Sequence, residues 1–364
     1  MFLRAFQCAV AASLFWQSAV LAQRPGIESL AEPPVPSDPL ELVTGDAQPV
    51  QDAEQRAAAI HLLTNARALS NVRAYAYDLK TTFNAYGSSE GAWNLEDTSP
   101  GRETYRWSAQ GPSYTAVNLR TNQLVYSDQP SGAIPLRLAQ ARTAIFFVYG
   151  QVGPRASVRT ASGSLNGTEV SCVLVALQAR EKLGAGPRRW EETEYCVDPK
   201  SGLLMTYSPV PGMYVAYDYS NALHFYDKII PDKFTITQAG QTIIEATTQS
   251  VTGTAKLDRA LFQPGNLQQV GAGPLMSPPW RVRSRELQRG VTANSALQVV
   301  EVDGLVTPQG QLTDLQVLAS SNPGLNQAAL ERAAKWDDRH SQEDAQAGAA
   351  PQSHEVLFTF EFVQ

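Results

Sequence analysis

The sequence predicts an α+β protein: a large, mostly antiparallel curved sheet or open barrel with two helices, followed by a small C-terminal β-β-α-β domain. Three observations carry this prediction. Between about residues 72 and 253, apolar side chains recur at every second position, as they do in strands with one buried face. Turn sequences such as "SPGR" and "QGPS" separate these strand candidates. The last segment, 285–364, combines three strand candidates with one short amphipathic helix.

The N-terminus has the pattern of an export signal. Residues 1–22 begin with a positive charge at Arg4, continue with an apolar stretch, and end in small residues before Gln23. We therefore expect a cleaved signal peptide and a periplasmic protein. The alternative is an uncleaved segment that tethers the protein to the inner membrane. Residues 23–50 are rich in proline and lack periodicity, which predicts a disordered leader.

The central part, 51–264, is expected to form one antiparallel β domain. Apolar residues at helical spacing predict a helix at 51–70, and a second helix is expected near 135–150. The helices would plug or cover one face of the sheet. Residues 265–284 are rich in glycine and proline and are interpreted as a linker to a separate domain at 285–364.

Cysteine usage predicts one disulfide. Removal of the signal peptide would take Cys8 with it and leave Cys172 and Cys196. A pair of cysteines in an exported protein indicates a structural bridge. A redox pair is the alternative, but the spacing is not that of a CxxC motif.

Charge is low and nearly balanced. The formal net charge is −6 and 18% of the residues are charged, so no general attraction to nucleic acid or anionic lipid is expected. A local basic cluster is interpreted as a solvated segment between domains; it comprises Arg281, Arg283, Arg285 and Arg289. An acidic cluster is interpreted as a solvated outer strand face; it comprises Glu191, Glu192 and Glu194.

The sequence offers no catalytic pattern on which to base an enzyme. The four histidines are scattered and none has the spacing of metal ligands; they are His61, His224, His340 and His354. No nucleophile elbow or phosphate-binding loop is present in the sequence. We therefore expect a non-enzymatic protein without a metal ion or cofactor.

The C-terminal segment has the clearest internal logic. In "HEVLFTFEFV" four apolar side chains alternate with Glu361 and others, so they should share one face; they are Val356, Phe358, Phe360 and Phe362. A helix that begins near Asn322 should cover this face. Its apolar stripe comprises Leu325, Ala329, Ala333 and Trp336.

This order of elements resembles the C-terminal domain of TonB-family proteins. The matching positions are Gly310, Leu312, Asp314, Val317, Ser320, Ser321, Leu325, Ala328, Ala329, Leu330, Ala333 and Trp336. The resemblance implies that the last strand binds an outer-membrane or periplasmic protein by strand addition, in a role linked to transport. It also implies that a homodimer can form through this domain. The expected partner-binding edge strand comprises Glu355, Val356, Leu357, Phe358, Thr359, Phe360, Glu361, Phe362 and Val363.

Two departures from the family pattern bear on energy transduction. The family's transducers carry a Ser-x-x-x-His pair in the N-terminal anchor, whereas Ser13 is followed here by Gln17, which cannot titrate. A globular domain also stands where the family has a long spacer rich in proline and charged residues. Coupling to a proton-driven complex is therefore in doubt.

The central domain resembles the LolA-like superfamily of periplasmic lipoprotein carriers. The resemblance lies in a helix before a strand meander, in "YCVDPKSGLLMTYS" and "FYDKIIPDKFTITQAGQTIIEATTQSV", and in the exit "LDRALFQPG". It implies a concave apolar face that holds acyl chains, which gives an alternative function as a lipid or lipoprotein carrier. The candidate lipid-facing residues are Tyr75, Tyr77, Phe83, Trp93 and Trp107. The same aromatic residues could instead fill a closed core.

Overall fold

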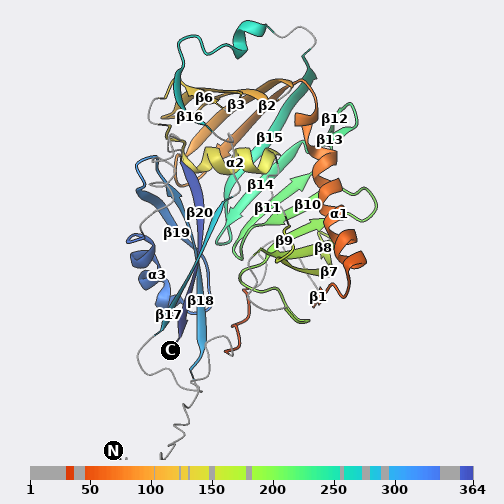
Figure 1. The fold of residues 1–364 in the computed structure, drawn as a ribbon, viewed down its shortest axis with the longest axis vertical. Helices are drawn as coiled ribbons and strands as arrows, with labels where there is room; N and C mark the ends of the chain where they lie inside the picture. The colour runs from red at the N-terminus through yellow and green to blue at the C-terminus, as the bar shows by residue number, and fades with distance from the viewer. Residues whose placement is uncertain are drawn as a thin grey trace, which may run out of the picture.

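The computed structural model describes residues 30–36, 46–101, 103–122, 124–129, 132–146, 152–177, 183–254, 258–272, 279–287, 295–336 and 353–363. The expected signal peptide lies outside the described residues. The described chain forms a large curved sheet with two helices on its inner side and a smaller four-stranded sheet beside it (Figure 1). The α+β class predicted from the sequence is confirmed. We refer to the large sheet with its helices as the body and to residues 295–363 as the tail.

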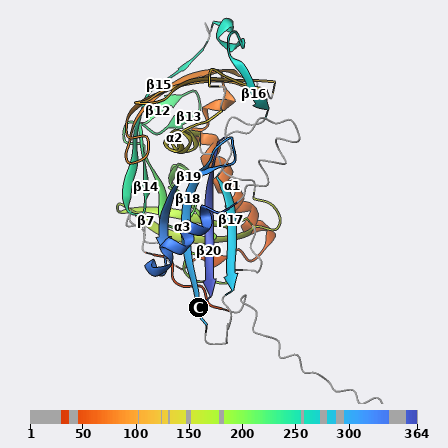
Figure 2. The ribbon, with the colours of Figure 1, turned by 90° about the vertical axis from the view of Figure 1, so that its left-hand side faces the viewer.

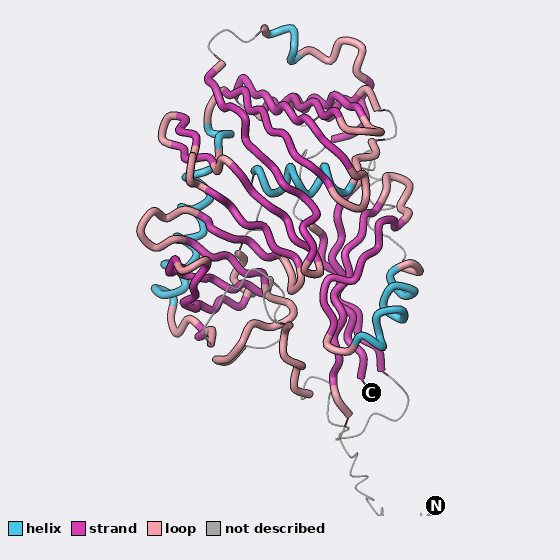
Figure 3. The backbone as a smooth tube through the Cα atoms, turned by 180° about the vertical axis from the view of Figure 1, so that it is seen from behind, coloured by secondary structure: helices cyan, strands magenta, loops and turns pink. Residues whose placement is uncertain are grey.

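The body sheet is antiparallel, curved and open, with β1 and β16 at its two ends; Figure 3 shows its strands from behind. In spatial order its strands are β1 (Gln48–Pro49), β7 (Ser157–Leu165), β8 (Thr168–Ala176), β9 (Thr193–Val197), β10 (Leu204–Ser208), β11 (Met213–Asp218), β14 (Lys233–Gln238), β15 (Gln241–Gly253), β2 (Tyr77–Ala85), β3 (Gly91–Gly101), β4 (Thr104–Gln110), β5 (Thr115–Thr121), β6 (Leu124–Ser127) and β16 (Gln268–Ala272). A separate hairpin pairs β12 (Leu223–Phe225) with β13 (Lys228–Ile230). Strand-to-strand connection by short turns makes the body a meander, as the alternating pattern predicts.

Two α-helices cover the inner face of the body sheet. The helix α1 (Ala53–Ser70) begins at Asp52, whose side chain accepts a 2.8 Å hydrogen bond from the backbone N–H of Gln55. The helix α2 (Leu136–Phe146) lies within the curve of the sheet (Figure 2). Both predicted helices are therefore confirmed. Among the described residues, no helix has the length and the apolar character needed to cross a membrane.

Apolar side chains from both helices and from the sheet form one main core. It includes Leu63 of α1, Leu138 of α2 and the stacked pair Phe83 and Trp93, whose ring centroids lie 5.5 Å apart. Strand β2 shows the reason for this arrangement, because its buried and more exposed side chains strictly alternate. Short 3-10 helices η2 (Val72–Ala74) and η3 (Arg259–Phe262) connect elements of the body.

The tail has the predicted β-β-α-β order. It comprises β18 (Leu297–Val306), β19 (Leu312–Ser320), η4 (Pro323–Leu325), α3 (Asn326–Ala333) and β20 (His354–Val363). Leu325 of η4 and Ala329 and Ala333 of α3 are buried against the phenylalanine face of β20. Trp336 packs edge-on against Phe358, with ring centroids 5.3 Å apart. The predicted contact between the helix and this face is confirmed.

Two expectations about connecting segments differ from the structure. Residues 265–284, interpreted as a linker, contain β16 and the beginning of a further strand, β17 (Trp280–Leu287). Residues 30–36 of the expected disordered leader lie against the protein, where Pro33 O accepts a 2.7 Å hydrogen bond from Trp190 Nε1. Leu30 and Val35 pack on the same cluster as Trp190. The partners of these segments lie far from them in the sequence, so local patterns could not predict the contacts.

Candidate partner-binding site

The last strand does not have the free edge that the sequence predicts. The tail sheet has the order β17-β20-β18-β19, so β20 lies between two neighbours. On one side it pairs antiparallel with β18, and on the other it pairs in parallel with β17. This register runs from Trp280 opposite Val356 to Leu287 opposite Val363. Figures 1 and 2 both show β17 alongside β20. The expectation of an open edge is thereby corrected: the protein covers it with its own segment.

One face of β17 completes the core of the tail. Trp280 and Val282 pack against the cluster formed by α3 and the phenylalanine face of β20. The ring of Trp280 also lies against that of His354, with centroids 3.5 Å apart and the ring planes tilted by 33°. Apolar contact on this face helps to hold β17 in register.

The other face of β17 carries three arginines that point toward the body. Arg281 donates to the backbone oxygens of Glu191 and Pro209. Arg283 and Arg285 both donate to the carboxylate of Glu361 in β20. The interpretation of the basic cluster as a solvated segment between domains is therefore wrong for Arg281, Arg283 and Arg285. Arg289 lies outside the described residues. Their alternation places all three side chains on one face of the strand.

Acidic residues from three separate parts of the chain meet these arginines. Besides Glu361 from the tail, Arg283 pairs with Glu32 of the leader segment at 3.2 Å and with Glu191 of the body at 3.6 Å. Burial, followed by the neighbouring charge of Glu191, raises the pKa of Glu32 to about 7. The β17 side of the tail sheet thus faces an acidic cluster, to which the tail, the body and the leader segment each contribute one glutamate.

The body-facing side of the tail sheet is polar yet buried. Glu301 of β18 is fully buried, and Thr359 of β20 donates to both of its carboxylate oxygens at 3.0 Å. Burial raises the pKa of Glu301 to about 8. Polar residues that alternate with apolar ones along a strand usually indicate a face exposed to solvent. In this protein that face packs against the body and is buried.

A second polar cluster joins the tail to α2 and β14. Gln140 Nε2 donates to Glu355 of β20 at 2.8 Å and to Asp303 of β18 at 3.1 Å. Gln238 Nε2 also donates to Asp303 at 2.6 Å, and Arg137 donates to both glutamines. Burial raises the pKa of Glu355 to about 7 and holds that of Asp303 well above its usual range, with Glu355 as the second cause for Asp303.

The candidate lipid-facing aromatics are mostly buried. Tyr77, Phe83, Trp93 and Trp107 expose 3% or less of their surface, and Tyr75 is partly buried. Phe83, Trp93 and Trp107 belong to the main core with residues of α2. In this structure they therefore have the arrangement of a closed core, which was the alternative to an acyl-binding face.

An ion pair that the sequence did not reveal fixes α2 to the sheet. Arg142 of α2 donates to Asp97 of β3 at 2.9 Å, and both side chains are buried. Tyr77 donates to the other oxygen of Asp97 at 2.6 Å, and the guanidinium lies 4.1 Å from the centroid of Trp107. Burial lowers the pKa of Arg142 to about 10. The signal available in the sequence was the presence of two arginines, Arg137 and Arg142, in a helix whose other buried side chains are mostly apolar.

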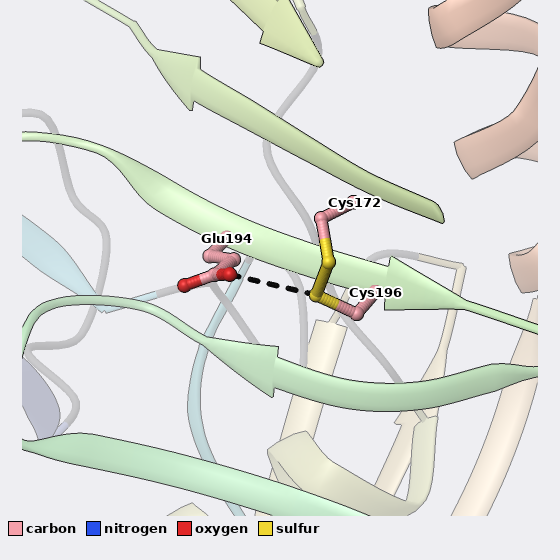
Figure 4. Close-up of side chains that lie close together, drawn as sticks. All are labelled: Cys172, Glu194 and Cys196. Carbon is pink, nitrogen blue, oxygen red and sulfur yellow. Dashed lines mark hydrogen bonds between the residues drawn. A yellow bond between two sulfur atoms is a disulfide. The ribbon is translucent and has the colours of Figure 1, made fainter. Parts of the chain in front are cut away.

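The predicted disulfide is present. Cys172 and Cys196 occupy directly opposed positions of β8 and β9, and their Cα atoms lie 4.1 Å apart. Glu194 lies beside the bridge, with an oxygen 3.5 Å from the sulfur of Cys196 (Figure 4). The three side chains have the composition of a metal-ligand group, but the two sulfurs are bonded to each other and offer no thiolate.

The acidic cluster near the bridge is not a solvated face. Glu192 and Glu194 are buried. Arg159 donates to Glu192 at 2.7 Å, and Arg188 donates to Glu194 at 3.1 Å. Glu191 instead turns toward Arg283 in β17. Both arginine partners in the body belong to structural ion pairs, since each also donates to backbone oxygens nearby.

One known protein family matches the tail. Residues 298–363 match the family described as "Gram-negative bacterial TonB protein C-terminal". The match begins with β18 and ends with β20, so β17 lies before its first residue. No curated protein sequence matched the chain.

Solved structures of low sequence identity also match. A putative outer membrane lipoprotein-sorting protein domain from Vibrio parahaemolyticus has 8% identity and a TM-score of 0.39, covering 57% of this chain and 97% of its own. A LolA superfamily protein from Nitrosomonas europaea has 11% identity and a TM-score of 0.37, covering 56% and 97%. MucB has 13% identity and a TM-score of 0.29, covering 76% and 96%. The resemblance of the tail to TonB-family proteins thus has a counterpart in the matched family.

Proposed function

We propose that this is an exported, non-enzymatic protein of the cell envelope whose tail binds a periplasmic or outer-membrane protein by strand addition to β20. The supporting observation is that a segment outside the matched tail unit, β17, already adds to β20 in parallel. Strand addition draws its affinity from main-chain hydrogen bonds and its specificity from alternate side chains. β20 offers both on the side that β17 occupies.

In this proposal the partner strand replaces β17. Because β17 belongs to the same chain, it reaches β20 without the entropy loss of bimolecular association. A free partner therefore binds weakly to the intact protein unless it fits the edge better than β17 does. This arrangement keeps a strand edge covered until the partner arrives, which also protects it from aggregation.

Partner capture from envelope extracts tests the proposal with three full-length baits. The first is the wild-type protein. In the second, the β17-replaced variant, alternating glycine and serine substitute for residues 280–287. In the third, Arg283→Cys and Thr359→Cys stand at opposed positions of the two strands, so that a disulfide locks β17 in place.

The expected recovery of partner is highest for the β17-replaced variant and lowest for the locked bait. Mild reduction of the locked bait should restore binding, while the native bridge is protected by burial. Oxidised and reduced forms of the same protein thus serve as their own control. Equal recovery from all three baits would contradict strand addition at this edge.

The alternative carrier function has weaker support. Its candidate aromatics are buried under α2, so an acyl chain would reach them only if the helix moved. Lipid extraction and mass spectrometry of purified protein tests this. Bound acyl species would favour a carrier, and their absence would leave strand addition as the account of function.

Export and self-association are parts of the same proposal. Intact mass should show a mature chain that begins at Gln23, whereas a retained Met1 would indicate the inner-membrane tether. A homodimer through the tail would exchange β17 between two copies. Light scattering of the wild-type protein and the β17-replaced variant tests this, since only the former could form such a dimer.

A further inference from the structure

The arginine-bearing face of β17 meets an acidic cluster. Its ion pairs reach three carboxylates from separate parts of the chain, which are Glu32, Glu191 and Glu361. Oε2 of Glu32 and Oε2 of Glu191 are both buried without a hydrogen-bond partner among the described residues. The acidic side of this contact therefore retains unused accepting capacity.

Removal of β17 would leave these carboxylates together without the cations of that strand. Buried like charges repel one another strongly, because the surrounding dielectric is low. A buried carboxylate that loses its partner is also costly, more so than a pair that was never formed. A strand that replaces β17 must therefore bring cations of its own or leave the acidic groups unsatisfied.

The strand register fixes where those cations must stand. Arg281, Arg283 and Arg285 lie opposite Leu357, Thr359 and Glu361 of β20. On the opposite face of β17, Trp280 and Val282 lie opposite Val356 and Phe358 and pack against the tail core. A neutral or acidic strand could satisfy the apolar positions but not the others.

We propose that the β20 edge selects an extended segment of an envelope protein that carries cations at alternating positions and apolar side chains at the two positions that pack on the tail core, added parallel to β20. This inference rests on the proposed function and names the class of partner. Arginine suits these positions because its guanidinium donates to two carboxylates at once, as Arg283 does here.

Recognition is shared among three parts of the chain. Glu361 belongs to the tail, but Glu191 belongs to the body and Glu32 to the leader segment. The tail unit alone would therefore discriminate less between basic and neutral strands than the full chain does. This sharing follows from the buried contact between tail and body.

Synthetic peptides test the selection directly on the full-length β17-replaced variant. The first peptide has the sequence of residues 280–287, WRVRSREL, with blocked ends. The second has citrulline at the three arginine positions, which preserves size and most hydrogen-bonding groups but removes the charge. Binding is measured by fluorescence anisotropy at low and at high salt.

The arginine peptide is expected to bind at least tenfold more tightly than the citrulline peptide, with a difference that shrinks at high salt. A Glu361→Gln substitution in the host should reduce the difference. Equal binding of both peptides would overturn charge selection while leaving strand addition intact. Failure of both peptides to bind a folded host would overturn the proposed function itself.

A second measurement covers the case in which the β17-replaced variant does not fold. The two peptides, each with a photo-reactive end group, are then added in excess to the wild-type protein. Preferential cross-linking of the arginine peptide to residues 353–363 supports the proposal. Equal cross-linking by both peptides, or none by the arginine peptide, overturns it.

Discussion

Gln140 of α2 and Glu355 of β20 form a 2.8 Å hydrogen bond that joins the body to the tail. Both side chains are buried, and the sequence assigns them to separate domains. The same glutamine also donates to Asp303 of β18. The two units therefore share a buried interface, and substitutions at this contact should change the stability with which the tail packs on the body.

The tail should be held more tightly at pH 5 than at pH 8. The folded-state pKa is about 7 for Glu355 and about 8 for Glu301, against an ordinary value of 4.5. Between these values the folded protein binds more protons than the unfolded one, so the free energy of unfolding falls as pH rises. We expect a loss of roughly 1–3 kcal/mol per carboxyl across that window. Urea unfolding at pH 5, 6, 7 and 8 measures it.

Neutral replacements provide the controls for this pH dependence. Glu355→Gln and Glu301→Gln should each flatten the profile between pH 5 and pH 8. Asp198→Asn should not, because hydrogen bonds from Ser201 and Lys200 lower the pKa of Asp198 and keep its titration below this range. A wild-type protein whose stability rises from pH 5 to pH 8 would contradict the assignment of these buried carboxyls.

Loss of the buried ion pair under α2 should destabilise the body strongly. Asp97→Asn leaves the buried guanidinium of Arg142 without its counter-charge, which costs about 3–5 kcal/mol. The matched control is Glu96→Gln in the same strand, whose pair with Lys80 is exposed and contributes about 0–1 kcal/mol. Chemical denaturation gives both values. Similar effects of the two substitutions would show that the Asp97 pair is not buried in solution.

The disulfide should contribute measurably to stability. The bridge joins residues separated by 24 positions, for which the loop-entropy relation gives about 3 kcal/mol. The double substitution Cys172→Ala with Cys196→Ala should lower the denaturation midpoint by a matching amount. Titration of thiols in the unfolded protein, purified without reductant, provides a direct check. Two free thiols per mature chain would contradict the bridge.

Replacing Gly212, in a turn of the body that contacts the tail, by a residue with a side chain should weaken the packing of the tail on the body. Gly212 has a φ of 84°, and a Cβ there would collide with the carbonyl oxygen of Leu318 in β19. Gly240 has a φ of 76° with nothing within 4 Å of such a Cβ, so it controls for backbone strain. Gly240→Ala should cost about 1 kcal/mol, and Gly212→Ala clearly more. Limited proteolysis between body and tail reports undocking, which only Gly212→Ala should promote.

Sequence patterns predicted the elements whose partners are local or share one apolar face. The tail was recovered because α3 and β20 each show their own amphipathic period. The two body helices and the meander were recovered for the same reason. The cysteine pair was predicted because only two cysteines remain once the expected signal peptide is set aside.

The contacts between body and tail could not be predicted in this way. Glu355 and Glu361 alternate with phenylalanines and so have the pattern of a solvated face, yet both are buried. Their partners lie in α2 and β17, far from them in sequence. The strand β17 was missed because its alternating residues are arginines in a segment rich in glycine and proline. The regular spacing of Arg281, Arg283 and Arg285 was the signal that could have revealed it.

Hydrogen exchange along residues 354–363 tests most directly whether β17 covers an edge that another strand can take. The wild-type protein, the β17-replaced variant and that variant with the WRVRSREL peptide are compared. We predict slow exchange of the β20 amides that point toward β17 in the wild-type protein, faster exchange in the variant, and slow exchange again with peptide. Indistinguishable exchange in all three samples would contradict the account.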